Sequence, residues 1–244
     1  MLKNTKTYSE IALVGSTSEI AISILNNLAL SDHAIVHLIG RQIPDNHIFR
    51  NKQIKFIFHK CDLNNSLEVT EFLSDLSRFK GLNLVLIAVG FLPEENSEFN
   101  LDDIQKSFQI NSLSSIKFLS SFTRLMNENA GGDILVCSSV ASIRPRTRNF
   151  TYGASKSALD FYAVGLQNKQ RKSNVSISIL RPGFVFTKMT RNFEPAPFAI
   201  NLNSLGKIAS KGLMKGKKVI YAPSKLKVIM NILRFMPRFF FNRL

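Results

Sequence analysis

The stretch Ile11 to Leu30, IALVGSTSEIAISILNNLAL, sets the pattern for the whole chain. Its apolar start ends in a glycine, small hydroxyl residues follow, and apolar residues then recur at helical spacing. A buried strand that passes at once into a helix is the repeating unit of a parallel α/β sheet. The stretch predicts a strand over 11–15 and a helix over 18–30.

The same alternation continues to the end of the chain. Further strands are predicted at 34–40, 54–60, 82–90, 132–139, 175–183 and 218–223, and helices at 67–79, 101–129 (two helices) and 152–172. The strands are continuously apolar, as in a sheet covered by helices on both faces. We expect a single Rossmann-type, doubly wound α/β domain over residues 1–224. Its proline-containing segment 184–203 is expected to form a loop over the site.

Composition limits the class of protein. The 244 residues are 45% hydrophobic and 20% charged, which indicates a globular chain. No apolar run is long enough to cross a bilayer and the first residues lack the core of a signal peptide, so we expect a cytoplasmic protein. Cys61 and Cys137 fall in predicted strands and fit buried thiols. The histidines have no ligand spacing, so no metal site is expected.

The basic end of the chain indicates contact with a membrane surface. The net charge is +15, and no acidic residue follows Glu194. Residues 225–244 predict an amphipathic helix, kinked at Pro237, which would lie in an anionic membrane interface. Its polar stripe consists of Lys227, Asn231, Arg234, Arg238 and Asn242. A helix that packs on the domain or in a dimer is the alternative, and Phe239–Phe241 suit either. No nucleic-acid module is recognisable, so nucleic acid is the least favoured partner.

The turn Val14 to Ala21, VGSTSEIA, lies where such a sheet binds a dinucleotide pyrophosphate at a helix N-terminus. Only Gly15 of the usual glycine pattern is present, because Glu19 and Ala21 occupy the other two positions. A plain turn with a Ser or Thr cap is the alternative. Arg41 follows the second strand, where a basic side chain suits a 2′-phosphate, so NADP(H) is favoured over NAD(H). Asp62 follows the third strand, within reach of an adenine amino group.

Four residues form a candidate catalytic set. Tyr152 and Lys156 lie four apart at a predicted helix start, so they share one face. Ser139 ends the preceding strand and Asn111 lies in the helical region before it. Together with "AVG" (88–90) and "RPG" (181–183), this order resembles the short-chain dehydrogenase/reductases over nearly the whole chain.

The resemblance implies roles for these residues. Tyr152 would donate the proton to the carbonyl oxygen, with its pKa lowered by Lys156 and the nicotinamide. Lys156 would also hold the nicotinamide ribose. Ser139 would hydrogen-bond the carbonyl oxygen, and Asn111 would hold a water in the proton path. The implied cofactor site comprises Gly15, Thr17, Ser18, Glu19, Ile20, Arg41, Asp62, Leu63, Ala88, Gly90, Tyr152, Lys156, Pro182, Gly183, Val185 and Thr187.

Within that family, the segments "TSEIA", "RPRTRNFTYGASK", "RPGFVFTKM" and the basic tail are similar to the reductase subunits of decaprenylphosphoryl-ribose 2′-epimerases. That similarity implies reduction of a polyprenyl-phosphoryl 2-keto-pentose, made by a flavin-dependent oxidase partner, to the arabinose epimer. Arg144, Arg146 and Arg148 would contact the substrate phosphate, with solvated loop arginines as the alternative. The family also implies a homo-oligomer.

Two other interpretations remain open. One is a reductase of another ketone, such as a 3-oxoacyl thioester or a soluble keto sugar. The other is a non-catalytic NADP(H)-binding subunit at the membrane, against which the complete set of four residues argues.

Overall fold

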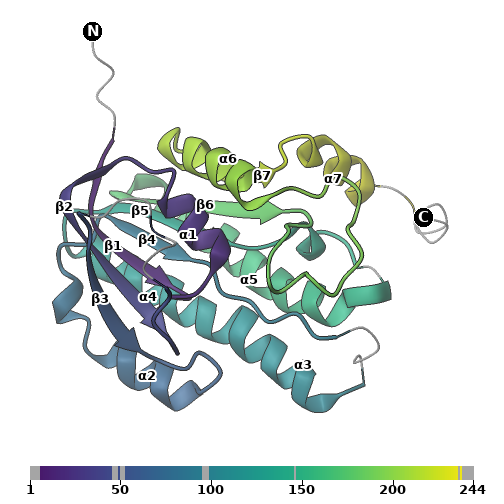
Figure 1. Ribbon diagram of the computed structural model, residues 1–244, viewed down its shortest axis with the longest axis horizontal. Helices are drawn as coiled ribbons and strands as arrows, with labels where there is room; N and C mark the ends of the chain where they lie inside the picture. Colours follow the sequence, from purple (N-terminus) through teal and green to yellow (C-terminus); the bar gives the residue numbers. More distant parts are fainter. Residues whose placement is uncertain are drawn as a thin grey trace, which may run out of the picture.

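The computed structural model describes residues 6–45, 49, 53–94, 99–145, 147–235 and 237. Within them one parallel sheet has the strand order β3-β2-β1-β4-β5-β6-β7 (Figure 1). Its strands are β1 (Tyr8–Val14), β2 (Leu30–Gly40), β3 (Lys55–Lys60), β4 (Leu84–Ile87), β5 (Gly132–Cys137), β6 (Val175–Pro182) and β7 (Val219–Ala222). The helices are α1 (Glu19–Leu25), α2 (Ser66–Ser74), α3 (Leu101–Phe108), α4 (Ser115–Asn127), α5 (Phe150–Lys169), α6 (Leu202–Met214) and α7 (Leu226–Phe235).

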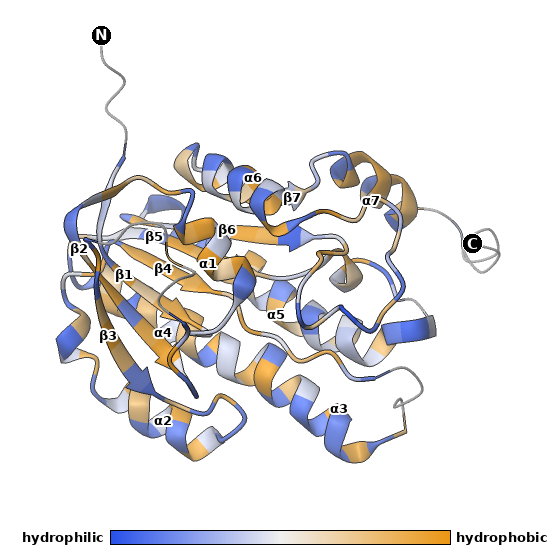
Figure 2. Cartoon of the chain, viewed as in Figure 1, coloured by the Kyte–Doolittle hydropathy of each residue, from blue (hydrophilic) through white to orange (hydrophobic). Residues whose placement is uncertain are grey.

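Helices cover both faces of the sheet, which confirms the predicted doubly wound fold. On one face, α1 and α6 pack on the strands through Ile22, Leu25 and Leu205. On the other, α2, α4 and α5 bury apolar side chains that include Phe118 and Leu159. Figure 2 shows the strands as mainly hydrophobic, as expected for a sheet with no face open to water.

The strand order creates the position for a site. β1 pairs with β2 on one side and with β4 on the other. The chain therefore builds the sheet in one direction through β2 and β3, and then crosses back to continue it from the other side of β1 with β4. In such sheets the carboxyl ends of the central strands border a crevice where ligands bind. The predicted cofactor turn after β1 and the catalytic residues after β5 both lie at this edge.

One predicted helix was wrong in extent and one helix was missed. The first helix ends at Leu25 rather than at residue 30, and Leu30 already begins β2. The Asn27 amide donates to the Ser23 carbonyl at 2.8 Å, a local bond that helps end the helix. Helix α6 was not predicted, although Asn201 caps it by accepting from the Ser204 N–H.

The first half of the tail helix predicted over 225–244 is present as α7, and its inner face packs on the domain. Residues 238–244, with Arg238, Phe239–Phe241 and Asn242, lie outside the described residues. Leu226 and Met230 are buried against Val140 and Tyr221. Close approach depends on Gly183, where a Cβ would lie 2.6 Å from Leu226 Cδ1. The kink expected at Pro237 involves neighbours that lie outside the described residues. Among the described helices, none is both long and apolar enough to cross a bilayer.

Candidate active site

The predicted catalytic residues come from three elements that meet at the carboxyl edge of the sheet. Ser139 follows β5, Tyr152 and Lys156 lie in the first turns of α5, and Asn111 lies between α3 and α4. A Cβ at Gly90, just after β4, would lie 3.7 Å from Asn111 Oδ1 and 3.8 Å from Lys156 Nζ. Gly90 therefore lies against two of the four residues and leaves the space beside them open.

Asn111 is held by a set of hydrogen bonds. It lies in a π-helical segment, Gln109–Ser114, that interrupts the α-helix. Its Oδ1 accepts from the Phe91 N–H at 2.7 Å, and its Nδ2 donates to the Phe91 carbonyl at 2.8 Å and to Ser155 Oγ at 2.9 Å. The wider turn of a π segment is frequent at functional sites. Here it directs a fully buried amide onto the chain that follows β4.

Lys156 is a buried cation at the end of two strands. Its Nζ donates to the Val89 carbonyl at 2.9 Å and to the Cys137 carbonyl at 3.0 Å. Burial lowers the pKa of this amine, and nearby Cys137 acts in the opposite direction. The two carbonyls stabilise the ammonium and fix it below the space next to Gly90.

Tyr152 corrects one expectation. Its pKa is raised rather than lowered, chiefly because burial disfavours the charged phenolate, with a smaller contribution from Cys137; interaction with Ser139 acts in the lowering direction. The Lys156 ammonium is directed to two backbone carbonyls. The phenol is therefore held in its acid form.

Ser139 is placed by the end of β5. The residue is extended, with φ −161° and ψ 157°, and its Oγ accepts from the Ala141 N–H at 3.1 Å. This bond caps a short 3-10 turn, Val140–Ser142, and holds the hydroxyl oxygen near the Tyr152 side chain. Because Ser139 Oγ is the acceptor in this bond, its own O–H can still donate a hydrogen bond to another group.

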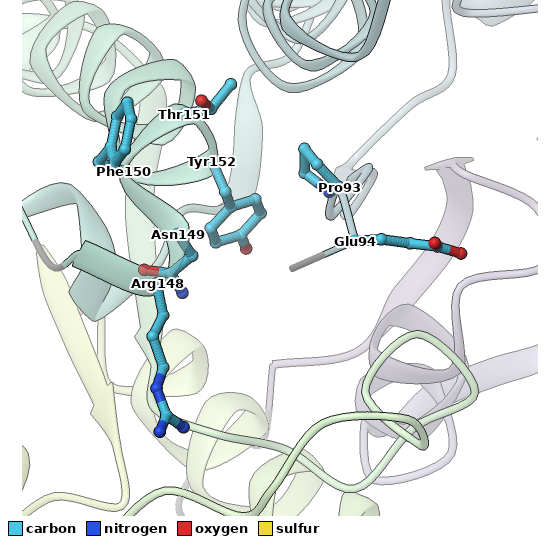
Figure 3. A pocket seen from close by; sticks show the side chains of 7 residues that line it. All are labelled: Pro93, Glu94, Arg148, Asn149, Phe150, Thr151 and Tyr152. Carbon is cyan, nitrogen blue, oxygen red and sulfur yellow. The ribbon is translucent and has the colours of Figure 1, made fainter. Parts of the chain in front are cut away.

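A small hollow opens at Tyr152 (Figure 3). Pro93 and Glu94 line one side and the segment from Arg148 to Tyr152 lines the other. In the picture the Tyr152 ring points into the space between the two sides, whereas Phe150 points away from it. Tyr152 therefore faces the entrance and the Phe150 side chain does not.

The predicted cofactor turn has the geometry that a dinucleotide requires. Gly15 has φ 96°, and a Cβ there would lie 2.8 Å from Val89 Cγ1 and 2.9 Å from the Ala88 carbonyl oxygen. Ser18 caps α1 by accepting from the Ala21 N–H at 3.4 Å. The first N–H groups of a helix have no partner within the helix, so those of Glu19 and Ile20 can serve a pyrophosphate. Gly15 and the start of α1 therefore fit the pyrophosphate of a dinucleotide cofactor.

Further predicted contacts surround this turn. Arg41 is exposed directly after β2, beside the Gln42 carbonyl that accepts from Ser16 Oγ at 2.7 Å. Asp62 Oδ1 accepts from the Asn64 N–H at 3.0 Å, and the Leu63 carbonyl accepts from Ser114 Oγ at 2.6 Å. These bonds fix the ends of β2 and β3 at the crevice.

Glu19 joins the cofactor turn to the segment after β6. Its Oε2 accepts from the Lys188 N–H at 2.7 Å, across 169 residues of sequence. Within that segment, the Thr190 hydroxyl donates to the Val185 carbonyl at 2.5 Å and lies 3.1 Å from the Thr187 hydroxyl. Thr187, predicted to contact the nicotinamide carboxamide, is thus held next to Val185 beside Pro182 and Gly183.

Comparison with known proteins establishes the family. The family model described as short chain dehydrogenase matches residues 10–197. The chain belongs to the short-chain dehydrogenase family. This is a family of oxidoreductases that act on CH–OH and C=O groups with a nicotinamide cofactor. The catalytic roles of Ser139, Tyr152 and Lys156 stay a prediction.

The chain is also similar to an uncharacterized oxidoreductase of Mycobacterium tuberculosis, with 34% identity over 129 residues. That match covers 53% of this chain and 52% of the relative, so the chain spans about half the length of the curated relative it matches.

Solved structures of short-chain dehydrogenases share the fold. A 3-oxoacyl-[acyl-carrier protein] reductase from Brucella melitensis in complex with NAD has a TM-score of 0.75 at 17% identity and covers 91% of this chain and 98% of its own. L-sorbose reductase from Gluconobacter frateurii, complexed with NADPH and L-sorbose, has a TM-score of 0.73 at 15% identity and covers 90% and 97%. At these identities the likeness is one of fold.

Two of the three arginines in the segment 144–148, Arg144 and Arg148, have different environments. Arg144 Nη1 donates to the Leu233 carbonyl at 2.6 Å and to the Arg234 carbonyl at 3.4 Å, at the end of α7. Arg148 lies 3.7 Å from Glu194 in an ion pair whose side chains are 71% and 86% exposed. Arg146 lies outside the described residues. The substrate-phosphate role stays a prediction, and Arg144 has a structural role as well.

Several residues that shape the site were not predicted. Ser155 donates to the Tyr152 carbonyl at 2.8 Å and accepts from Asn111, while Met189 Cε would lie 3.4 Å from a Cβ at Gly90. The three-residue spacing of Thr187 and Thr190 is a signal for a hydroxyl turn that the sequence did carry. Among the described residues no group of three or more potential metal ligands comes together.

Proposed function

We propose that this short-chain dehydrogenase reduces the keto group of a lipid-linked sugar, a polyprenyl-phosphoryl 2-keto-pentose, to the arabinose epimer. The observation that carries the reductase part is that Asn111 and Lys156 both approach Gly90, while Ser139 and Tyr152 interact with each other, at the same carboxyl edge of the sheet. The resemblance of the cofactor turn, the arginine segment and the basic tail to epimerase reductase subunits supports the substrate.

The residues of the chain divide the work at the carbonyl. A reduced nicotinamide, when bound, supplies the hydride. The Tyr152 phenol, kept in its acid form by burial, donates the proton to the carbonyl oxygen. The Ser139 hydroxyl donates a hydrogen bond to the same oxygen and stabilises the charge that develops there. Buried Lys156 adds positive charge next to this point, and Asn111 holds the chain after β4 in place.

The cofactor we propose is NADP(H). Arg41 is exposed immediately after β2, where its guanidinium is free to reach a 2′-phosphate at the rim of the crevice. Exchange to Arg41→Ala should raise the KM for NADPH about tenfold and leave the KM for NADH nearly unchanged, since one charged phosphate contact is lost. Equal effects on both cofactors would contradict this assignment.

The keto substrate requires an oxidation before this enzyme acts. A hydroxyl of the lipid-linked pentose must lose two electrons, and a flavin-dependent oxidase partner is the class of enzyme we propose for that step. Reduction from the opposite face of the carbonyl then inverts the carbon. The short-chain dehydrogenase therefore completes an epimerisation for surface-glycan or cell-wall synthesis.

A substrate panel tests the proposal. Purified wild-type protein and Tyr152→Phe are assayed for NADPH oxidation in detergent micelles with three substrates: the polyprenyl-phosphoryl keto-pentose, a soluble keto sugar and a 3-oxoacyl thioester. We expect turnover of the lipid-linked substrate in wild type, and a loss of about a thousandfold or more in Tyr152→Phe. Tyr162→Phe, a tyrosine in the middle of α5, is the matched control. Turnover of only a soluble substrate would reassign the substrate class but keep the chemistry.

A further inference from the structure

Helix α7 carries apolar side chains on two opposite faces. Leu226 and Met230 point inward and are buried. Val228, Ile232 and Phe235 are 63%, 60% and 80% exposed and follow one another at helical spacing, so they form a continuous outward row. A helix that only packs on its own domain needs the buried apolar face with Leu226 and Met230. The exposed apolar face adds nothing to that packing.

An exposed aromatic residue extends this row toward the segment 184–203 after β6, hereafter the substrate loop. Phe198 is 43% exposed and has φ 65°, a left-handed conformation that costs free energy for a bulky residue. The Lys225 ammonium lies 4.1 Å from the centre of its ring. The loop therefore holds an apolar ring outward at the start of α7 against its own backbone preference.

The charges around the row have one sign. Lys227 and Arg234 are exposed along the flank of α7, and Lys225 lies at its start. The sequence has no acidic residue after Glu194. A narrow apolar row bordered by basic side chains is the pattern of a helix that lies in the plane of an anionic lipid surface.

We propose that Phe198, Val228, Ile232 and Phe235, hereafter the docking row, insert into the interface of an anionic lipid bilayer. A second copy of the chain is a poorer occupant, because a stable protein interface involves roughly 20–30 residues on each side and the docking row has four. An acidic protein partner would pair with the lysines but would not need four apolar side chains in water-exposed positions.

The docking row lies next to the catalytic residues. The inner face of α7 packs on Val140, the residue after Ser139, and on Gly183 after β6. Arg144 holds the end of α7 through the Leu233 carbonyl. A bilayer bound at the docking row therefore lies beside the entrance through which a lipid-linked carbonyl arrives. In this respect the inference rests on the proposed function, but lipid binding is measured without substrate.

The absence of tryptophan from the sequence allows a direct test of insertion. Ile232→Trp places a single reporter in the docking row, and Leu67→Trp places one at an exposed position of α2 as the matched control. Each is mixed with vesicles of phosphatidylglycerol and phosphatidylcholine, or of phosphatidylcholine alone. We expect a blue shift of Ile232→Trp emission, and quenching by brominated acyl chains, with anionic vesicles. Leu67→Trp should show neither.

Co-sedimentation of the full chain with the same vesicles measures the energetics. The triple variant Val228→Ser, Ile232→Ser and Phe235→Ser should partition at least tenfold more weakly than wild type. The triple variant Leu67→Ser, Phe99→Ser and Leu101→Ser removes three exposed apolar residues outside α7 and should bind like wild type. Replacing Lys225, Lys227 and Arg234 with Gln should weaken binding to anionic vesicles and remove its salt dependence.

Three results would overturn the proposal. The first is no binding of wild type to anionic vesicles. The second is an Ile232→Trp emission that anionic vesicles leave unchanged. The third is sedimentation velocity showing that the docking-row triple variant converts a dimer to a monomer in the absence of lipid, which would identify a second copy as the occupant. If the wild-type protein binds anionic vesicles but does not reduce the lipid-linked substrate, only the proposed function is refuted.

Discussion

At the scale of single residues, burial of Tyr152 determines the protonation state of its phenol. Burial raises the pKa of its phenol, so the hydroxyl is protonated throughout the neutral range. A proton donor in reduction needs this form, whereas alcohol oxidation needs the phenolate. The raised pKa matches the proton-donor role that we propose for reduction, although the sequence led us to expect a lowered pKa.

The two directions should therefore respond differently to pH. Because the raised pKa keeps the phenol protonated, the kcat for carbonyl reduction should change less than about twofold between pH 6 and 8. The kcat for alcohol oxidation should rise steadily with pH over the same interval, as the small phenolate fraction increases. Initial rates in both directions with NADPH and NADP⁺ check this. An oxidation rate that is flat with pH would contradict the account.

A second residue-scale effect concerns stability. His37 Nδ1 lies 2.9 Å from His59 Nε2, and His37 Nε2 lies 3.3 Å from Glu10 Oε1. Burial, His37 and Arg78 lower the pKa of His59 from 6.5 to about 4. Burial and Arg78 also lower the pKa of His37, and burial raises that of Glu10. Both imidazoles are therefore neutral in the folded protein at pH 7.

The sign of the pH dependence follows from these shifts. Between pH 6.5 and 4 the unfolded chain binds protons at His59 that the folded chain does not, so stability falls as the pH falls. We expect the Tm to decrease from pH 7 to pH 5, and to decrease less in His59→Phe. His33→Asn, at an exposed position with φ 61° that Asn tolerates, is the control and should behave like wild type. Thermal melts at the two pH values measure the difference.

At the scale of elements, Glu19 connects the start of α1 to the substrate loop. Its bond to the Lys188 N–H is lost in Glu19→Ala, so the loop should open more often. We expect trypsin to cleave after Lys188 or Arg191 several times faster, and the KM for the cofactor to rise more than kcat falls. Glu194→Gln, which removes only an exposed ion pair with Arg148, is the matched control. Equal trypsin sensitivity of wild type and Glu19→Ala would contradict the role of Glu19.

Two arginines of the same segment should differ in their effect on stability. Arg144→Ala removes a charged donor from the carbonyl end of α7 and should lower the free energy of unfolding by about 1 kcal/mol. Arg148→Ala removes a solvated ion pair and should change it by less than about 0.5 kcal/mol. Urea denaturation of both variants gives the comparison. A larger loss in Arg148→Ala would show that the two environments have been misassigned.

The elements also show where sequence patterns are informative. Apolar runs located the strands, because the central strands β1, β4, β5 and β6 are mostly buried and even the edge strand β3 is half-buried over its inner residues. The end of α1 and the whole of α6 were missed, because asparagine caps and a loop that pairs Val185 with Ile200 determine them. Glu19 seemed to disrupt a glycine pattern, yet its partner, Lys188, is far away in sequence. The hydrogen bond between Glu19 and the Lys188 N–H joins residues far apart in sequence, so no local sequence pattern predicts it.

At the scale of the whole molecule, topology explains why the candidate catalytic residues lie at one edge of the sheet, as the sequence predicted. In a parallel sheet the residues that follow each strand reach the same edge, so Ser139 after β5 and Gly90 after β4 had to be neighbours. The direction of the pKa shift at Tyr152 was not predictable in this way, because it depends on how deeply the phenol is covered. The position of Arg144 against α7 likewise depends on packing between distant segments.

The measurement that tests the central claim most directly follows the hydride. NADPH that carries deuterium at both C4 positions of the nicotinamide is given to the enzyme with the polyprenyl-phosphoryl keto-pentose, and the product is analysed by mass spectrometry. The account predicts one deuterium on the former carbonyl carbon with wild type, and no product above background with Tyr152→Phe. A product without deuterium, or one formed equally well by Tyr152→Phe, would contradict it.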